Sequence, residues 1–209
     1  CLRANTQPGP VRPGQLTVAI VGGGATGVEL AAELAGTTRQ LPAYGLDKID
    51  PEKDVRIVII EAADRLVPGL PPRLSKAVED RLRELGVEVH TGERVTEIDA
   101  KGLCTAAGLC VPASMMVWSA GIKAPDFLAD IDGLESNRIH QLVVRPSLQT
   151  TWDDNIFAFG DCAACPMPGS DRNVPPRAQA AHQQASMLVK SIRRRLNGQP
   201  LPEYVYRDY

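Results

Sequence analysis

Short apolar runs and longer amphipathic stretches alternate along residues 16–118. The apolar runs are typical of strands buried in a parallel sheet, because both faces of such strands are covered. They lie at 16–21 (LTVAIV), 55–60 (VRIVII), 87–90 and 115–118. Between them, residues 25–41 carry small and apolar side chains at helical spacing and predict a helix. Residues 72–85 predict a second helix, which ends at Gly86 and whose apolar face holds Leu74, Val78, Leu82 and Leu85.

Residues 94–112 interrupt this alternation. Gly102 and Gly108 divide them into segments that predict a small antiparallel meander. Strands that alternate with helices predict a parallel sheet with right-handed crossovers. The expected fold class is therefore α/β, a Rossmann-like three-layer arrangement of a parallel sheet, helices and an antiparallel β-meander.

The rest of the chain has a less regular pattern. Polar residues, prolines and glycines predict a helix tail with a linker at 1–13 and a loop at 42–54. After residue 121 the pattern predicts, in order, a linker at 122–140, an extended run at 142–148, a strand at 156–159 and a long helix at about 175–196. We therefore expect one domain over 14–121 and a second, incomplete domain formed by 1–13 and 122–209.

The composition fits a soluble globular protein. Of 209 residues, 44% are apolar and 23% are charged, and the formal net charge is −2. No overall field would recruit nucleic acid or an anionic membrane, so no nucleic-acid partner is expected. No run approaches the ~18 apolar residues of a membrane-spanning helix, and no signal peptide precedes the first strand. Because the chain begins with Cys1 rather than methionine, we expect it to be a piece of a longer protein.

Five cysteines are an odd number in a chain of this size without a secretory signal. The count argues against a disulfide framework and for a reducing compartment. Cys162 and Cys165 form a C-x-x-C, for which we weigh a structural pair against a redox dithiol and favour the structural pair. His90, His140 and His182 share no metal-ligand spacing, and two cysteines are too few for a zinc site, so no metal is expected.

A glycine motif, Gly22-Gly23-Gly24-Ala25-Thr26-Gly27, follows the first predicted strand and opens the first predicted helix. This G-x-G-x-x-G in a strand–turn–helix context predicts a dinucleotide site. Gly22 permits the tight turn, Gly24 lets the backbone approach a pyrophosphate, and Gly27 lets the helix pack on the strand. The phosphates then meet the free N–H groups of the first helical turn, at Ala25 and Thr26, and the positive end of the helix. A glycine turn without a ligand is the alternative.

Glu61 ends the second predicted strand, where a dinucleotide site places an acid that accepts hydrogen bonds from the adenosine ribose. It lies further from the glycines than the usual ~20 residues, and the loop at 42–54 explains the excess. An acid at this position repels a 2′-phosphate, so NADH is expected rather than NADPH. Glu29, two residues past Gly27, either complements the helix dipole or faces the nicotinamide end.

Residues 151–161 (TWDDNIFAFGD) form a second motif, T-x6-A-x-G-D. The predicted strand at 156–159 delivers Gly160 and Asp161 to its carboxyl end, where ligands bind in open α/β sheets. The pattern resembles the flavin-binding return motif of flavoproteins with two dinucleotide-binding domains. That resemblance implies that Gly160 and Asp161 hold the ribityl and pyrophosphate part of FAD. A strand that ends in a Gly-Asp turn without a ligand is the alternative.

The order of the motifs also resembles these flavoproteins, which insert an NAD domain into an FAD domain. The resemblance makes 14–121 the NADH-binding domain, and 1–13 with 122–209 part of the FAD-binding domain. Ser119-Ala120-Gly121 resembles the crossover between the two domains, so Ala120 and Gly121 are implied to position the nicotinamide. The first G-x-G-x-x-G of the family is not in this chain, so the chain alone is expected to retain little FAD.

The segment from Pro175 to Ala185 narrows the resemblance to type II NADH:quinone oxidoreductases. It contains A-Q-x-A-x-Q, with prolines suited to a helix start and with Gln179 and Gln183 four residues apart on one face. In that family this helix points its N-terminus toward the flavin, so Ala178 is implied to contact the cofactor, and the glutamines of the helix line the quinone pocket. A solvated helix face is the alternative for the two glutamines.

The resemblance implies that the full-length protein passes a hydride from NADH to FAD and electrons on to a membrane quinone of a respiratory chain, by cofactor chemistry and without a catalytic side chain. This chain alone is expected to be inactive. We expect a peripheral protein on the cytoplasmic face of the inner or plasma membrane, attached through a C-terminal segment outside this chain, and a homodimer is compatible with that.

Two alternative functions stay open. One is another flavin reductase of the superfamily, acting on a ferredoxin or a disulfide, and the other is a non-enzymatic NADH-binding redox sensor.

Overall fold

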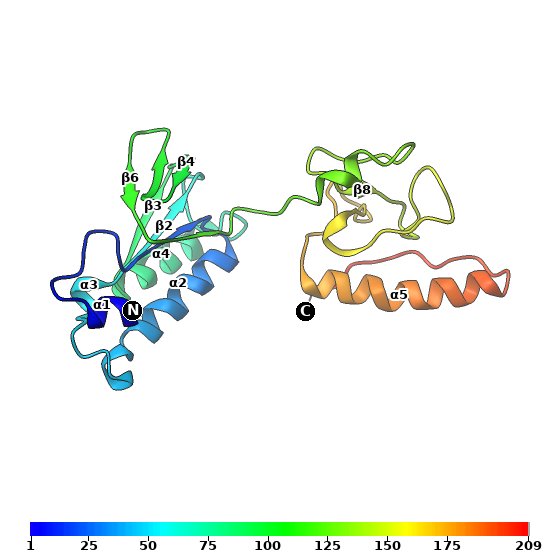
Figure 1. Ribbon diagram of the computed structural model, residues 1–209. Coiled ribbons are helices and arrows are strands. Elements are labelled where there is room, and N and C mark those ends of the chain that lie inside the picture. Colours follow the sequence, from blue (N-terminus) through cyan, green and yellow to red (C-terminus); the bar gives the residue numbers. More distant parts are fainter. Residues whose placement is uncertain (209) are drawn as a thin grey trace. The chain divides into compact units, whose positions relative to one another are not determined.

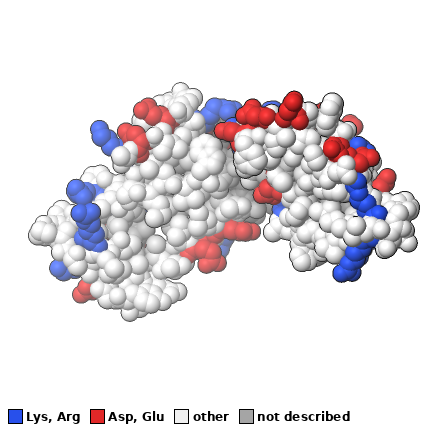
Figure 2. Space-filling model, turned by 45° about the vertical axis from the view of Figure 1, so that its right-hand side comes forward, with Lys and Arg blue, Asp and Glu red and all other residues white. Residues whose placement is uncertain are grey.

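The computed structural model describes residues 1–208, which form two compact units (Figure 1). The first unit runs from Cys1 to Gly121, and the second begins at Ile122. This boundary coincides with the Ser119-Ala120-Gly121 segment. No helix in the described part of the chain is both long and apolar enough to cross a membrane. On the face drawn in Figure 2, acidic and basic side chains both occur on each unit.

A four-stranded parallel sheet forms the centre of the first unit. Its strands are β1 (Thr17–Val21), β2 (Arg56–Glu61), β3 (Val87–Thr91) and β7 (Met115–Trp118), in the order β3-β2-β1-β7. All the pairings between them are parallel, which confirms the four strands predicted from the apolar runs. Since β1 lies between β2 and β7, the chain moves outward on one side of β1 and then returns to its other side. Ligands of open α/β sheets bind at the carboxyl ends of the strands at such a reversal.

Two layers cover this sheet (Figure 1). They are the helices α2 (Ala25–Thr38) and α4 (Pro72–Glu84) on one face, and the meander of β4 (Val95–Asp99), β5 (Gly102–Thr105) and β6 (Cys110–Pro112) on the other. Successive residues of β1 face opposite layers, as the pleat of a strand requires. Ile20 packs in the cluster that contains Leu82 of α4, and Ala19 packs in the cluster that contains Leu103 of β5. The predicted three-layer α/β fold class is confirmed.

The helix predicted over 25–41 ends earlier, at Thr38. Proline lacks the N–H that a continuing helix needs, and a short 3₁₀ helix, η1 (Leu41–Tyr44), contains Pro42 instead. The loop predicted over 42–54 also holds a one-turn helix, α3 (Pro51–Asp54). Its N-cap residue, Asp50, accepts a hydrogen bond from the Glu52 N–H at 3.1 Å. An aspartate cap followed by proline at the first helical position explains why this turn forms.

Residues 1–13 pack within the first unit, whereas the sequence pattern predicted that they belong to one domain with 122–209. The helix α1 (Leu2–Thr6) buries Ala4 in a cluster with Leu46 and Ile49. The Asn5 side chain accepts a hydrogen bond from the Lys48 N–H at 3.0 Å. These contacts join segments about 40 residues apart, so no local pattern predicts them.

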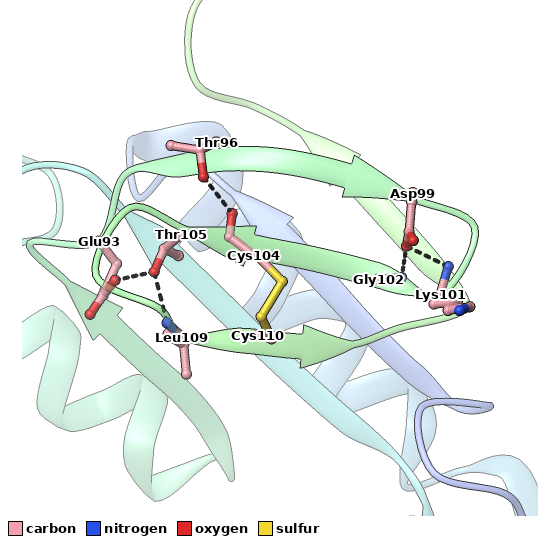
Figure 3. The surroundings of a disulfide bond; sticks show 9 residues. All are labelled: Glu93, Thr96, Asp99, Lys101, Gly102, Cys104, Thr105, Leu109 and Cys110. Carbon is pink, nitrogen blue, oxygen red and sulfur yellow. Dashed lines mark hydrogen bonds between the residues drawn. A yellow bond between two sulfur atoms is a disulfide. The ribbon is translucent and has the colours of Figure 1, made fainter.

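A disulfide joins Cys104 and Cys110 within the meander (Figure 3). The two residues are direct partners in the antiparallel register of β5 and β6, so pairing of the strands brings their side chains together. The odd cysteine count argued against a disulfide framework, yet one pair is bonded. An odd count was a poor guide because one pair is set by strand register, while Cys1, Cys162 and Cys165 stay free.

The second unit has little regular structure before its last helix. Its elements are η2 (Asp126–Ala129), β8 (Leu142–Val143), η3 (Gly160–Cys162), β9 (Ala163–Ala164) and α5 (Ala178–Leu196). The strand predicted at 156–159 does not form, and Phe157 makes only an isolated bridge with Gln149. Within the extended run predicted at 142–148, only Leu142–Val143 forms a regular strand. Val144 makes an isolated bridge with Thr150, and a turn follows in which the Leu148 N–H donates to the Arg145 carbonyl oxygen. The predicted long helix is confirmed as α5, which begins after the two prolines rather than at Pro175.

Candidate functional site

The glycine turn between β1 and α2 requires two of its glycines for close backbone packing. Gly22 has a φ of +112°, and a Cβ added there would lie 2.7 Å from backbone atoms of Ser119 and Ala120. Gly27 is buried, and a Cβ added there would overlap the carbonyl oxygen of Gly22. The roles predicted for these two positions, a tight turn and close helix packing, therefore have a direct steric basis.

Gly24 differs from these two glycines because the space beside it is open. No atom of residues 1–208 lies within 4 Å of a Cβ added at this position, and its φ of −71° is accessible to any residue. Gly24 is the N-cap of α2, and no side chain caps this helix. The first residues of α2, Ala25 and Thr26, are exposed. An anion can therefore approach the N–H groups and the positive end of α2 directly.

Glu61, at the end of β2, holds the glycine turn through its carboxylate. One carboxylate oxygen accepts a hydrogen bond from the Gly23 N–H at 2.5 Å, and the other accepts from the Ala63 N–H at 2.6 Å. A carboxylate offers about four acceptor positions, so each oxygen keeps capacity for a hydroxyl donor. The ribose contact stays a prediction. The hydrogen bond between the Glu61 carboxylate and the Gly23 N–H of the turn was not predicted from the sequence.

A cavity of about 400 Å³ opens at the carboxyl ends of β1, β2 and β7, beside the glycine turn. It lies entirely within the first unit, and its lining includes five of the residues that the sequence singled out, namely Gly22, Gly24, Glu61, Ala120 and Gly121. Ser119 fixes the β7 side of the cavity, because its hydroxyl donates to the carbonyl oxygens of Val21 and Gly22 at 3.0 Å each. The site is thus assembled from the turn and from the ends of neighbouring strands.

Glu29 lies outside this cavity. Its side chain is exposed on α2 and makes no hydrogen bond or ion pair within residues 1–208. The geometry of the first unit therefore does not distinguish the two roles weighed for it, and its contact with the nicotinamide end stays a prediction.

Three residues of the cavity wall were not predicted from the sequence to belong to the site, namely Glu93, Arg94 and Trp118. Glu93 follows β3 and is held in place, because its N–H donates to the Glu61 carbonyl oxygen at 2.9 Å and its carboxylate accepts from the Thr105 hydroxyl at 2.5 Å (Figure 3). Trp118 is 60% exposed at the end of β7. All three follow or end a predicted strand, and carboxyl ends of parallel strands meet at one edge. Applying that rule to every strand would have found them.

The second motif forms a tight turn in the second unit. Gly160 has a φ of +68°, in the left-handed region that favours glycine. Asp161 follows it in η3, and its carboxylate is exposed and makes no hydrogen bond or ion pair within residues 1–208. The predicted strand before the turn is missing, yet the turn places a free carboxylate at the surface.

The two glutamines of the A-Q-x-A-x-Q motif contact the C-terminal segment of the chain. The side-chain amides of Gln179 and Gln183 both donate to the Arg207 carbonyl oxygen, at 2.9 and 2.7 Å. The side-chain oxygen of Gln183 also accepts from the Tyr204 hydroxyl at 3.1 Å and from the Arg207 N–H at 3.2 Å. The i, i+4 spacing does put both on one face of α5, as predicted, but in this chain that face binds a neighbouring segment. Ala178, the first residue of α5, is exposed and has no side-chain cap before it.

Cys162 and Cys165 are not joined to each other. The Cys162 thiol donates to the Phe159 carbonyl oxygen at 3.1 Å, whereas Cys165 is completely buried. Burial raises the pKa of the Cys165 thiol to about 11, because the thiolate would lose its solvation. A thiol that stays protonated at neutral pH is a poor nucleophile, so this geometry favours the structural pair. Among the described residues, no group of His, Cys, Asp and Glu is arranged to hold a metal ion.

Thiol alkylation of the native protein is expected to separate the five cysteines into three classes. Exposed Cys1 and half-buried Cys162 should react first, and buried Cys165 should react only on unfolding. The disulfide-bonded Cys104 and Cys110 should react only after reduction. Mass spectrometry of peptides alkylated in native buffer, in denaturant, and in denaturant with reductant tests this order. Alkylation of Cys104 without reductant would contradict the disulfide.

The comparisons with known proteins agree with this architecture. A family model described as pyridine nucleotide-disulphide oxidoreductase matches residues 2–185. The chain is 46% identical over 194 residues to a type II NADH:quinone oxidoreductase of Haemophilus influenzae, which covers 93% of this chain and 43% of that protein. It is 31% identical to a protein of the same name from Staphylococcus aureus, over 92% of this chain and 48% of that one. The chain thus spans about half the length of the curated relatives that it matches.

Solved structures share the fold. NDH2 from Plasmodium falciparum, solved in complex with NADH, has a TM-score of 0.75 at 19% identity and covers 92% of this chain and 54% of its own. A ferredoxin reductase from Rhodopseudomonas palustris has a TM-score of 0.68 at 26% identity, over 91% of this chain and 43% of its own. The family model covers most of the chain and includes both the glycine turn and the Gly160–Asp161 turn, so the chain belongs to the pyridine nucleotide-disulphide oxidoreductase family.

Proposed function

We propose that the first unit binds NADH and that the full-length protein is a flavin-dependent NADH dehydrogenase that reduces a quinone. The observation that carries the proposal is the glycine turn, which is open at Gly24 and borders a cavity of about 400 Å³ at the carboxyl ends of β1 and β7. The pyrophosphate of NADH would meet the uncapped N-terminus of α2 there. The Glu61 carboxylate beside the turn disfavours a 2′-phosphate by charge repulsion, so the site favours NADH over NADPH.

The residues of the second unit fit a flavin. The free carboxylate of Asp161 can accept hydrogen bonds from ribityl or ribose hydroxyls, and Gly160 allows the positive φ that the turn before it needs. The N-terminus of α5 at Ala178 has no side-chain cap, so its positive end is available to a negative group. We propose that Gly160, Asp161 and Ala178 bind FAD in the full-length protein. When bound, FAD supplies the acceptor for the hydride of NADH and the donor of two electrons to the quinone.

The protein residues then contribute position and electrostatics. Ala120 and Gly121 border the cavity without large side chains and leave room for a nicotinamide ring. Trp118, on the same wall, offers an exposed aromatic face to a flat ring. These groups orient the nucleotide, and no side chain of the first unit has to act as a nucleophile in hydride transfer.

A quinone acceptor is supported by the similarity to relatives named type II NADH:quinone oxidoreductase, together with the Gln179 and Gln183 pair on α5. Each glutamine uses one N–H for the Arg207 carbonyl oxygen and has a second N–H that can donate to a quinone oxygen.

We also propose that the full-length protein is attached to the cytoplasmic face of the membrane by residues outside this chain, because its quinone substrate is lipid-soluble. The alternative acceptor is a ferredoxin, which the ferredoxin reductase neighbour at 26% identity favours.

Steady-state turnover of the full-length protein tests the proposal. NADH oxidation is followed by absorbance with a water-soluble quinone, an oxidised ferredoxin or a low-molecular-weight disulfide as acceptor. We expect turnover with the quinone and a preference for NADH over NADPH. Turnover with the disulfide or the ferredoxin and none with the quinone would refute the quinone assignment. NADH binding without transfer to any acceptor would favour a redox sensor.

Replacing Gln179 by leucine is expected to lower quinone turnover roughly tenfold, since one hydrogen bond to a reacting polar group is worth about 1–2 kcal/mol. Turnover with ferricyanide, which needs no quinone pocket, should stay within about twofold of the unchanged enzyme. Exposed His182 lies between the two glutamines in the sequence, and His182→Ala is the matched control on the same helix. Equal losses with quinone and ferricyanide would show that Gln179 acts on stability or on the flavin.

A further inference from the structure

Two buried glutamine side chains hold the backbone of the Gly160–Asp161 turn. Gln184, on α5, is 2% exposed, and its side-chain oxygen accepts a hydrogen bond from the Gly160 N–H at 2.7 Å. Gln141, directly before β8, is 7% exposed, and its side-chain amide donates to the Asp161 carbonyl oxygen at 2.9 Å. Two consecutive residues of one turn are therefore bound by side chains from two distant parts of the sequence.

Gln141 is itself fixed by a second amide. The Asn137 side chain donates to the Gln141 side-chain oxygen at 2.9 Å. The Asn137 side-chain oxygen accepts from the N–H groups of Ile139 and Gln141, at 3.0 Å each. The amide of Gln141 therefore has one defined orientation, with its oxygen toward Asn137 and its N–H toward the turn. A connected network of this kind specifies geometry more strongly than an isolated hydrogen bond.

Gln184 is a polar side chain at a buried position of α5. The buried position on α5 lies beside the apolar cluster that contains Ala158, Ala163 and Ala180, where an apolar side chain would be favoured. A buried amide there costs free energy unless it is hydrogen-bonded. Its described hydrogen bond is to Gly160, a residue of positive φ whose added Cβ would meet the Ala181 Cβ at 3.3 Å. The amide is thus placed to fix the turn.

The turn is held through its backbone, whereas the acid that it presents is left free. Both bonds to the glutamines use main-chain groups, and the Asp161 carboxylate makes no hydrogen bond or ion pair within residues 1–208. We propose that Gln184 and Gln141 are positioning residues that fix the direction of the Asp161 carboxylate toward the hydroxyls of the bound flavin nucleotide. The proposal rests on the flavin role of Asp161 proposed above. It adds that the affinity for FAD depends on these two amides acting through that carboxylate.

Binding of FAD to the full-length apoprotein tests the proposal, with quenching of FAD fluorescence as the readout. Gln184→Met keeps the length of the side chain and removes the acceptor, so the Gly160 N–H is left unpaired. We expect its FAD dissociation constant to rise about tenfold or more, as for loss of one buried hydrogen bond. Gln184→Glu retains an acceptor oxygen and should recover much of that loss. Ser191→Ala is the control, because Ser191 is a buried polar residue of the same helix whose hydroxyl donates to the Met187 carbonyl oxygen, away from the turn.

The double variant with Asp161→Ala separates positioning from general stability. If Gln184 acts through the carboxylate, Gln184→Met should change FAD affinity by less than about twofold once Asp161 is alanine. An equal loss of affinity in both backgrounds, or a loss matched by Ser191→Ala, would overturn the inference. Gln141→Met tests the other contact by the same titration and gives the answer should Gln184→Met fail to fold.

Different results would overturn the positioning role of the two glutamines and the flavin role of Asp161. Tight FAD binding by the unchanged protein that is lost in Asp161→Ala, but kept in both Gln184→Met and Gln141→Met, would overturn this inference and leave the proposed function standing. No FAD binding by the unchanged full-length protein would overturn the proposed flavin role, and this inference with it.

Discussion

Replacing Gly27 by alanine is expected to abolish NADH binding and to destabilise the first unit. A Cβ at this buried position would overlap the Gly22 carbonyl oxygen and would lie 2.8 Å from the Ser119 hydroxyl oxygen. The first of these atoms is backbone and cannot rotate away, so α2 must move relative to β1. Overpacking of this kind costs about 1–3 kcal/mol, and the displaced turn no longer presents its N–H groups to a pyrophosphate. The measurements are the thermal midpoint of the protein and titration with NADH, followed by protein fluorescence.

Gly24→Ala tests NADH binding separately from stability, which Gly27→Ala cannot do. Within the described part of the chain, no atom lies within 4 Å of a Cβ at this position, and the backbone angle suits alanine. The variant should therefore fold as well as the unchanged protein, yet its NADH affinity should fall by about tenfold or more, because a methyl group occupies the space of the pyrophosphate. Gly36→Ala, at another open position of α2, should leave binding unchanged and should not lower stability. Unchanged NADH binding by Gly24→Ala would exclude close approach of the phosphates to this turn.

Replacing Glu61 by glutamine is expected to weaken NADH binding about tenfold and to narrow the preference for NADH over NADPH. The carboxylate accepts from the Gly23 and Ala63 N–H groups, one with each oxygen. A glutamine has one acceptor oxygen, so its NH₂ group must face one of these donors. An unpaired or opposed donor of this kind costs about 1–3 kcal/mol. The loss of negative charge also removes the repulsion of a 2′-phosphate, so affinity for NADPH should fall less than affinity for NADH.

Asp64→Asn is the matched control for that prediction. Asp64 lies three residues further along, and its carboxylate is 85% exposed and 4.0 Å from the Arg65 guanidinium. Exposed pairs of this kind contribute about 0–1 kcal/mol, so both affinities should stay within about twofold. Equal changes in the two variants would indicate a general effect of charge. A Glu61→Gln protein with unchanged NADH and NADPH affinities would remove Glu61 from the site.

The parallel sheet and the glycine turn could be predicted because their signals are local. An apolar run of about five residues and a glycine triplet are both contained in one stretch of sequence, and they determine a buried strand and the turn that follows it. Gly22 and Gly27 are required by the steric limits of the backbone itself. The meander and α5 were predicted for the same reason, the first from its glycine spacing and the second from prolines suited to a helix start.

Other predictions failed where distant segments decided the outcome. The apolar residues at 156–159 favoured a strand, but their pairing with residues 148–150 is limited to one isolated bridge, between Phe157 and Gln149, so no regular strand forms. Cys104 and Cys110 meet because the register of β5 and β6 makes them direct partners, which a cysteine count cannot show. The segment 1–13 packs on residues about 40 positions away.

The sequence by itself determined the fold class, the four parallel strands, and the position of the glycine turn with an acid at the end of the next strand. Only the tertiary structure decided that the acid also bonds the turn at Gly23 and that Glu93 and Trp118 line the cavity. It also decided that Gln184 and Gln141 form hydrogen bonds with the backbone of the Gly160–Asp161 turn. The physical reason is the range of the interactions. Backbone sterics and the burial of an apolar run act within a few residues, whereas a hydrogen bond between side chain and backbone depends on which segments the fold brings into contact.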